Sequence, residues 1–161
     1  MLLQVACRQH SPDADVEHWF TSHRSDFEQL LALAQADPVV TIQPNLLLIQ
    51  RGPGRIARFP IRKASELPRE LPEQRWHRYR ELLSLLHVRT LYKGERGMMF
   101  QMDAPGILNG DSQKGILYSL EALRSRSSLD NLTATDLMST SCRGTKRIQD
   151  HWFVYLSFSC N

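Results

Sequence analysis

Three cysteines are the residues whose type and spacing most directly suggest chemistry, namely disulfide formation and lipidation. Cys142 and Cys160 flank a predicted C-terminal hairpin, and an antiparallel register centred on His151 places them opposite each other. The same register pairs Ile148 with Val154, two residues that we expect to face the core. The spacing therefore predicts a disulfide between Cys142 and Cys160, and with it an oxidising compartment. The alternative is a pair of buried thiols that pack as small hydrophobic residues.

The segment before Cys7 is similar to the end of a bacterial lipoprotein signal, in which leucines and a small residue precede the cysteine that is lipidated. The chain begins Met-Leu-Leu-Gln-Val-Ala-Cys and then becomes polar, as a tether should. The basic region and most of the apolar run of such a signal are missing. We expect residues 1–12 to be a signal remnant or tether with Cys7 as the lipidation candidate, or else an ordinary cytoplasmic N-terminus.

Charge is spread unevenly over the 161 residues, whose formal net charge is +3. Residues 1–50 carry two Arg and six acids, residues 51–96 carry twelve Lys/Arg and five acids, and residues 97–161 carry six of each. The densest basic stretch holds four arginines that we take as partner-binding candidates: Arg51, Arg55, Arg58 and Arg62. This stretch is either a patch for an anionic partner or a solvated strand face balanced by the acidic first helix. Because aromatic residues are sparse in it, stacking on bases is disfavoured.

No arrangement of residues in the sequence matches a catalytic, cofactor-binding or metal-binding motif. The stretch 110–115 contains Lys114, but a phosphate-binding loop needs Gly-Lys-Ser/Thr leading into a helix, and here we expect an apolar strand. The six histidines form no His-x-x-x-His unit, the cysteines form no Cys-x-x-Cys unit, and no Gly-x-Ser-x-Gly elbow is present. We therefore expect no enzymatic activity, no metal and no cofactor, and interpret Lys114 as a surface lysine in a turn.

Length and composition limit the fold class. The chain is 42% hydrophobic, which is typical of a globular domain, and its length suits one domain. No apolar run approaches the roughly 18 residues of a membrane span. We expect a single domain at residues 13–161 behind the tether at 1–12.

The apolar pattern predicts two amphipathic helices, at residues 13–36 and 72–87. Asp13 or Asp15 can cap the first helix, and the second carries Arg75, Arg78 and Arg80 on its polar face. Strands are predicted at 39–43, 46–50, 55–61, 89–93, 98–102, 116–120, 146–149 and 152–160, and a short helix at 129–139. This pattern predicts an α+β fold in which an antiparallel sheet packs against two amphipathic helices.

The C-terminal part of the chain resembles a group of small, mostly uncharacterised exported proteins and lipoproteins of Gram-negative bacteria. The resemblance lies in the Lys-Gly turn and tyrosine strand at 110–119, the Leu-Asp pair Leu129-Asp130, and the Trp-Phe-Val-Tyr strand that starts at Trp152. It implies export and a role other than catalysis, and it carries over no activity.

Three functional classes remain open. The first is a non-enzymatic binding protein of the bacterial envelope, periplasmic and attached to the membrane only through a lipid anchor; one version is an immunity protein that inhibits a secreted hydrolase toxin. Its partner would be a protein that contacts the four arginines and the loop 103–115, where Asp111 and Lys114 are candidates. The second is a cytoplasmic nucleic-acid or regulatory binding protein that uses the basic segment 51–96. The third is a hydrolase with an unrecognised site.

Overall fold

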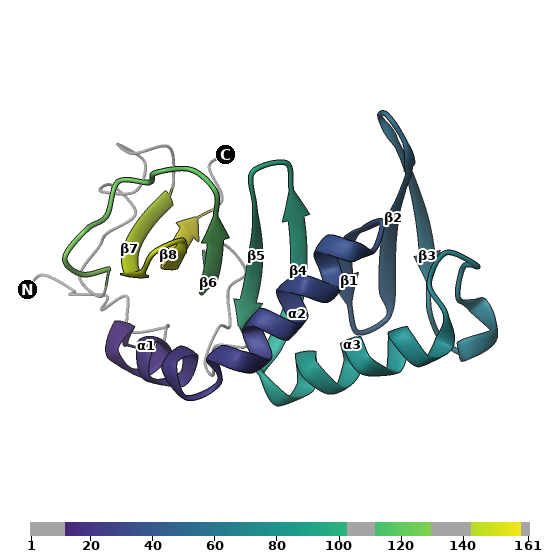
Figure 1. Ribbon diagram of the computed structural model, residues 1–161, viewed down its shortest axis with the longest axis horizontal. Coiled ribbons are helices and arrows are strands. Elements are labelled where there is room, and N and C mark those ends of the chain that lie inside the picture. The colour runs from purple at the N-terminus through teal and green to yellow at the C-terminus, as the bar shows by residue number, and fades with distance from the viewer. Residues whose placement is uncertain (1–11, 103–111, 130–142, 159–161) are drawn as a thin grey trace, which may run out of the picture.

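The computed structural model describes residues 12–102, 112–129 and 143–158, which form helices packed against one face of an eight-stranded antiparallel sheet (Figure 1). The helices are α1 (Asp13–Ser22), α2 (Arg24–Ala36), the short 3-10 helix η1 (Ala64–Glu66) and α3 (Glu73–Leu85). The strands are β1 (Val39–Gln43), β2 (Leu46–Gly52), β3 (Arg55–Pro60), β4 (Val88–Gly94), β5 (Gly97–Met102), β6 (Ser112–Ser119), β7 (Arg143–Gln149) and β8 (Trp152–Phe158). The predicted α+β class with a single domain is confirmed.

The strands follow the order β3-β2-β1-β4-β5-β6-β8-β7 across the sheet. A row of mutually paired residues crosses six of these strands on the face that the helices cover. Its members are all buried: Leu47, Ile42, Leu91, Phe100, Ile116 and Val154. From the helices, the Phe20 ring lies 5.0 Å from that of Trp152, and the Phe27 ring lies 5.6 Å from that of Phe100. Removal of this apolar area from water, at about 25 cal/mol per Å², holds the two layers together.

The predicted helix at 13–36 is in fact two helices, because the backbone leaves helical geometry at His23, with φ −120° and ψ 22°. The His23 N–H donates to the carbonyls of Trp19 and Phe20, and the His23 carbonyl accepts the first hydrogen bond of α2 from the Phe27 N–H. The His23 ring stacks on the Trp19 ring at 3.8 Å. This bend allows both Phe20 and Phe27 to be buried in the core, with their rings 5.4 Å apart.

The hairpin of β7 and β8 has a different register from the predicted one. Lys146 pairs with Val154 and Arg143 pairs with Ser157, whereas the prediction pairs Ile148 with Val154. The shift arises because the turn contains only two residues and the strand before it is irregular next to Ile148.

The observed register differs from the one on which the C-terminal disulfide is predicted, because Ile148 does not pair with Val154. The predicted pairing of these two residues is wrong. Cys142, Cys160, Cys7 and Asp111 lie outside the described residues, as does most of the predicted short helix at 129–139. The disulfide and the lipid anchor stay predictions.

Strand β6 begins earlier than predicted and includes residues that the sequence pattern assigns to a turn. Lys114 lies within β6, paired with Leu156 of β8, and its side chain is buried. Gly115 pairs with Gln101 of β5 so closely that a Cβ atom there would lie 2.1 Å from the Phe100 carbonyl oxygen. The glycine therefore permits a close approach of two strands, and the expectation of a surface lysine in a turn is wrong.

Acidic residues are missing from the strands and are concentrated in α1 and α2. None of the eight strands contains Asp or Glu, whereas α1 and α2 together carry five acids and one arginine. The strand lysines contact the helical layer: Lys93, Lys114 and Lys146. The strand arginines are all exposed: Arg51, Arg55, Arg58, Arg89, Arg143 and Arg147. The sheet is thus the basic layer of the molecule.

Candidate functional site

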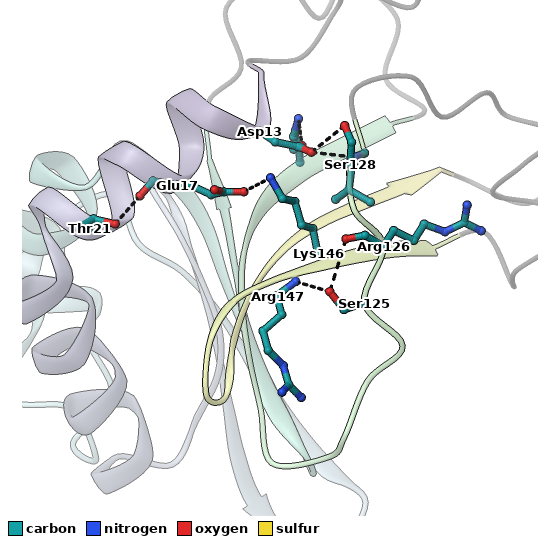
Figure 2. A network of polar contacts seen from close by, with 10 residues as sticks. Asp13, Glu17, Thr21, Ser125, Arg126, Ser128, Lys146 and Arg147 are labelled. Atoms are coloured by element: carbon teal, nitrogen blue, oxygen red, sulfur yellow. Dashed lines mark hydrogen bonds and ion pairs between the residues drawn. The ribbon is translucent and has the colours of Figure 1, made fainter.

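Lys114 belongs to a buried ion pair at the start of α1. Its Nζ lies 2.7 Å from Asp13 Oδ1, and the two side chains are 4% and 2% exposed. Asp13 Oδ2 accepts hydrogen bonds from the Leu129 backbone N–H at 2.6 Å and the Ser128 hydroxyl at 3.3 Å (Figure 2). Asp13 therefore does not cap α1, which starts after Pro12 without a side-chain cap. The carboxylate instead ties α1 to β6 and to the segment before residue 130.

This ion pair is structural. Burial raises the pKa of Asp13, but the hydrogen bonds from Leu129 and Lys114 and the charges of Lys114 and Lys146 outweigh it, so the pKa lies below its usual range. One turn further along α1, Glu17 pairs with Lys146 of β7 (Figure 2). Because these ionised groups are engaged with one another, and the Asp13–Lys114 pair is also buried, they hold α1 on the sheet rather than serve a ligand.

A second cluster of ionisable side chains surrounds Asp37, the residue that follows α2. Its carboxylate accepts hydrogen bonds from the Tyr79 hydroxyl at 2.9 Å and from the Arg75 guanidinium at 3.1 Å. Lys93 donates to the backbone carbonyls of Ala34 and Asp37. Burial, followed by the hydrogen bond to Asp37, raises the pKa of Tyr79 far above its usual range, so this hydroxyl stays protonated. Tyr79 is fully buried, and the cluster therefore joins α2, α3 and β4.

The groove between α2 and α3 is lined by charges that are already matched. It encloses about 790 Å³ and includes Arg75, which pairs with Asp37, and Arg78, which pairs with Glu81 at 3.2 Å. Its remaining acid at the rim, Glu70, pairs with an arginine of β2 at 2.8 Å. With its charges compensated internally, this groove offers a partner little electrostatic attraction.

The opposite side of α3 carries a groove of different character. It runs between α3, the β1–β2 turn and the start of β4, and it consists of two adjoining hollows of about 120 and 390 Å³ that share Pro44, Trp76 and Arg80. We name it the α3 basic groove. Its lining residues are Gln43, Pro44, Asn45, Ile61, Arg62, Lys63, Trp76, His77, Arg80, Leu83, Ser84, His87, Val88 and Arg89.

The backbone at the end of α3 shapes one end of this groove. His87 has a φ of 53°, a left-handed conformation that costs a non-glycine residue roughly 1 kcal/mol. Its N–H donates to the Ser84 carbonyl, which ends the helix and leads the chain into β4. The tight exit places Arg89, next to Val88 in β4, beside Ser84 and His87 of the groove.

Positive charge predominates around the α3 basic groove. Arg62, Lys63, Arg80 and Arg89 are exposed and form no ion pair with a described residue, and no carboxylate from the described ranges lines the groove. Glu66, near one end, accepts hydrogen bonds from the backbone N–H groups of Arg62 and Lys63, and these bonds, followed by the charges of the two side chains, lower its pKa. Glu66 therefore offsets part of the positive charge at that end. The net positive charge that surrounds this concave surface attracts anionic groups.

The four arginines predicted as partner contacts lie in three different environments. Arg51 is paired with Glu70 and is not free for a partner. Arg55 and Arg58 are exposed on β3, an edge strand of the sheet. Arg62 lines the α3 basic groove. The predicted contact at Lys114 is buried, so it is not available on the surface.

Arg80 and Arg89 are groove residues that the sequence pattern does not single out. Arg80 is visible as part of the polar face of the second predicted helix, but nothing in the sequence joins it to Arg62 or Arg89. The one available indication is the excess of basic residues in segment 51–96, which contains all four groove cations.

The structure and the comparisons leave the groove as the main lead to function. Among the described residues, no group of three or more His, Cys, Asp or Glu side chains is placed to hold a metal ion. No helix in the described ranges is long and apolar enough to cross a membrane. Comparisons with protein-family models, with curated proteins and with solved structures find no match to this chain.

Proposed function

We propose that this protein is a non-enzymatic binding protein that holds an acidic segment of a partner protein in the α3 basic groove. The observation that carries the proposal is that four cations line one groove without an ion pair to a described residue, and that Glu66 offsets only part of their charge. These cations are Arg62, Lys63, Arg80 and Arg89. Three of the four are arginines, whose planar guanidinium groups match the two oxygens of a carboxylate. Partner carboxylates would supply the missing negative charge.

The size of the groove suits a short extended segment. Along α3 the groove reaches from Trp76 to Ser84, which corresponds to roughly 12 Å at about 1.5 Å per helical residue. An extended chain advances about 3.3 Å per residue, so about four residues fit along this part of the groove. Trp76, Leu83 and Val88 provide buried apolar walls, which favours a segment that mixes acidic with apolar side chains.

Nucleic acid is the second candidate, favoured by the strands without Asp or Glu and by the charge of segment 51–96. Against it, recognition of single strands relies on aromatic rings that stack on bases. Trp76, the large aromatic residue of the groove, is only 3% exposed, and the exposed ring of Tyr92 is not part of the groove lining. Carboxylates of a protein therefore suit this surface better than bases.

The cell-envelope location remains a proposal that depends on Cys7 and on the resemblance to exported proteins. Within it, an immunity protein is the case in which the acidic segment belongs to a secreted hydrolase toxin. Purified products of neighbouring genes, tested singly for binding to this protein and for loss of hydrolase activity, would decide that case.

Titration by fluorescence anisotropy tests the proposal with three labelled probes: a peptide of about eight residues alternating Glu and Leu, its counterpart with Lys in place of Glu, and an oligothymidine of about eight nucleotides. We expect the acidic peptide to bind, more weakly at about 200 mM than at about 50 mM NaCl because salt screens exposed charges. The Lys peptide should not bind. Tighter binding of the oligonucleotide would favour the nucleic-acid function, and equal binding of both peptides would refute recognition of acidic groups.

A further inference from the structure

We infer that the outer edge of β3 binds an extended acidic segment of a partner protein as an additional strand of the sheet. The inference rests on the proposed function for the acidity of the partner, and it adds a second binding surface with a defined mode. β3 lies at one end of the strand order, beside β2, so one side of its backbone has no neighbouring strand. Six residues of β3 offer about 20 Å of pairing edge.

The two edge strands, β7 and β3, differ in whether other described segments form hydrogen bonds with their outer side. Along β7, the Arg126 N–H donates to the Thr145 carbonyl at 2.8 Å, and the Arg147 N–H donates to the Ser125 hydroxyl at 2.8 Å (Figure 2). The Thr145 hydroxyl donates to the Arg124 carbonyl. These bonds cover the β7 edge, whereas no described residue makes a comparable bond to the outer side of β3. The outward N–H and C=O groups of β3 are therefore available to an incoming strand.

The side chains of β3 indicate which strand would be accepted. Arg55 and Arg58 are exposed and have no ion pair with a described residue, and Ile56 between them is 57% exposed. Successive residues of a strand point to opposite faces, so Ile56 and Arg58 share one face and Arg55 lies on the other. An incoming strand would place an apolar residue beside Ile56, a carboxylate beside Arg58, and a second carboxylate beside Arg55 on the opposite face. Backbone hydrogen bonds would supply affinity, and these side-chain pairs would supply specificity.

The same charges disfavour the simplest competing occupant, a second copy of this chain. Pairing of β3 with β3 of another molecule would bring four arginines onto one pair of strands, with Arg55 or Arg58 opposite the same residue in some registers. Like charges on paired strands destabilise the pairing. We therefore assign the edge to an acidic strand from a different protein, and Arg55 and Arg58 also act against self-association through this edge.

Backbone methylation of a synthetic strand separates strand addition from simple charge attraction. The probe is a fluorescent hexapeptide Val-Glu-Thr-Val-Glu-Val, whose two carboxylates are three residues apart, as Arg55 and Arg58 are. Its control is the same peptide N-methylated at alternate residues, which removes one row of N–H donors and keeps the charge. We expect the unmodified probe to bind, to slow amide hydrogen exchange along β3, and to bind at least about tenfold more tightly than the methylated control. Equal binding of the two peptides would overturn the inference.

Paired variants distinguish failure of this inference from failure of the proposed function. Arg55→Glu/Arg58→Glu should weaken binding of the unmodified probe at least about fivefold, while Arg124→Glu, an exposed arginine at the other end of the sheet, should change it less than about twofold. Loss of binding in Arg80→Glu alone, with exchange protection confined to the α3 basic groove, would refute the edge and support the groove. Binding that none of these variants changes would refute both.

Discussion

Replacement of Lys114 by methionine should destabilise the protein strongly, because it leaves a buried carboxylate without its cation. Asp13 and Lys114 are 2% and 4% exposed, and their charged atoms lie 2.7 Å apart. Loss of one partner from such a pair costs roughly 3–5 kcal/mol. Methionine fills most of the volume, and Asp13 keeps its hydrogen bonds from Leu129 and Ser128, so we expect about 3 kcal/mol at pH 7.

A second, more exposed ion pair between α1 and the sheet provides an internal control for the effect of burial. Lys146 and Glu17 are 23% and 30% exposed, so Lys146→Met should cost about 1 kcal/mol. Lys63→Met, at an exposed lysine that forms no ion pair with a described residue, should cost less than about 0.5 kcal/mol. Urea unfolding, monitored by circular dichroism, measures the stability of all three variants. The comparison requires that the slope of the unfolding free energy against urea concentration is similar in the variants and the native protein.

The pH dependence of stability gives an independent check that the charge of the Asp13 carboxylate causes the effect. In the native protein the pKa of Asp13 is lowered, so its contribution is present above about pH 4, the unfolded value, and is lost as the pH falls further. Without Lys114, the hydrogen bond and the charge of that lysine no longer lower the pKa of Asp13, so this pKa is higher in the variant than in the native protein. The difference in unfolding free energy between native protein and Lys114→Met should therefore narrow as the pH falls through the pKa of Asp13 in the variant. The reasoning would be refuted if Lys114→Met lowered the unfolding free energy by less than about 1 kcal/mol at pH 7, or if its difference from the native protein did not change with pH.

Three further changes test the packing. Gly115→Ala should destabilise the protein by about 2 kcal/mol or more, because the new Cβ would meet the Phe100 carbonyl oxygen at 2.1 Å; an unchanged unfolding midpoint in urea would contradict this close approach. Tyr79→Phe should cost about 1–2 kcal/mol in thermal or urea unfolding, since the hydroxyl donates to the buried Asp37 carboxylate, and a neutral result would remove the proposed link between α2 and α3. Phe27→Ala should cost about 3–5 kcal/mol because the ring is fully buried in the aromatic core, and a cost near 1 kcal/mol would mean that this core is loosely packed.

Periodicity predicts the elements of this fold well, because helices and strands bury one side of a regular repeat. The strand at 39–43 has the predicted bounds, and the second helix begins directly after Pro72, as proline at a helix start suggests. The break at His23 is not predictable in this way, since the apolar stripe continues through it from Phe20 to Phe27. The break depends on how two helices fit the curved sheet, which is a tertiary property.

The remaining errors concern contacts between distant parts of the chain. Lys114 looks like a surface residue because a lysine is rarely buried, and its partner Asp13, which supplies the opposite charge in the interior, is far away in the sequence. The hairpin register depends on one irregular residue, Ile148, which changes every pairing beyond it. The α3 basic groove is assembled from residues of several elements, so segment charge indicates its sign but not its location, as Arg62 and Arg89 illustrate.

The most direct test of the central claim is the affinity of the Arg80→Glu/Arg89→Glu variant for the acidic Glu-Leu peptide. The matched control is Arg124→Glu/Arg126→Glu, which makes the same change in net charge along the β7 edge, and thermal unfolding verifies that both variants fold. Each reversal in the groove removes an attraction and adds a repulsion of roughly 1 kcal/mol, so we expect the groove variant to lose at least about tenfold in affinity and the control less than about twofold. Equal losses in the two variants, or none in either, would contradict binding in the α3 basic groove.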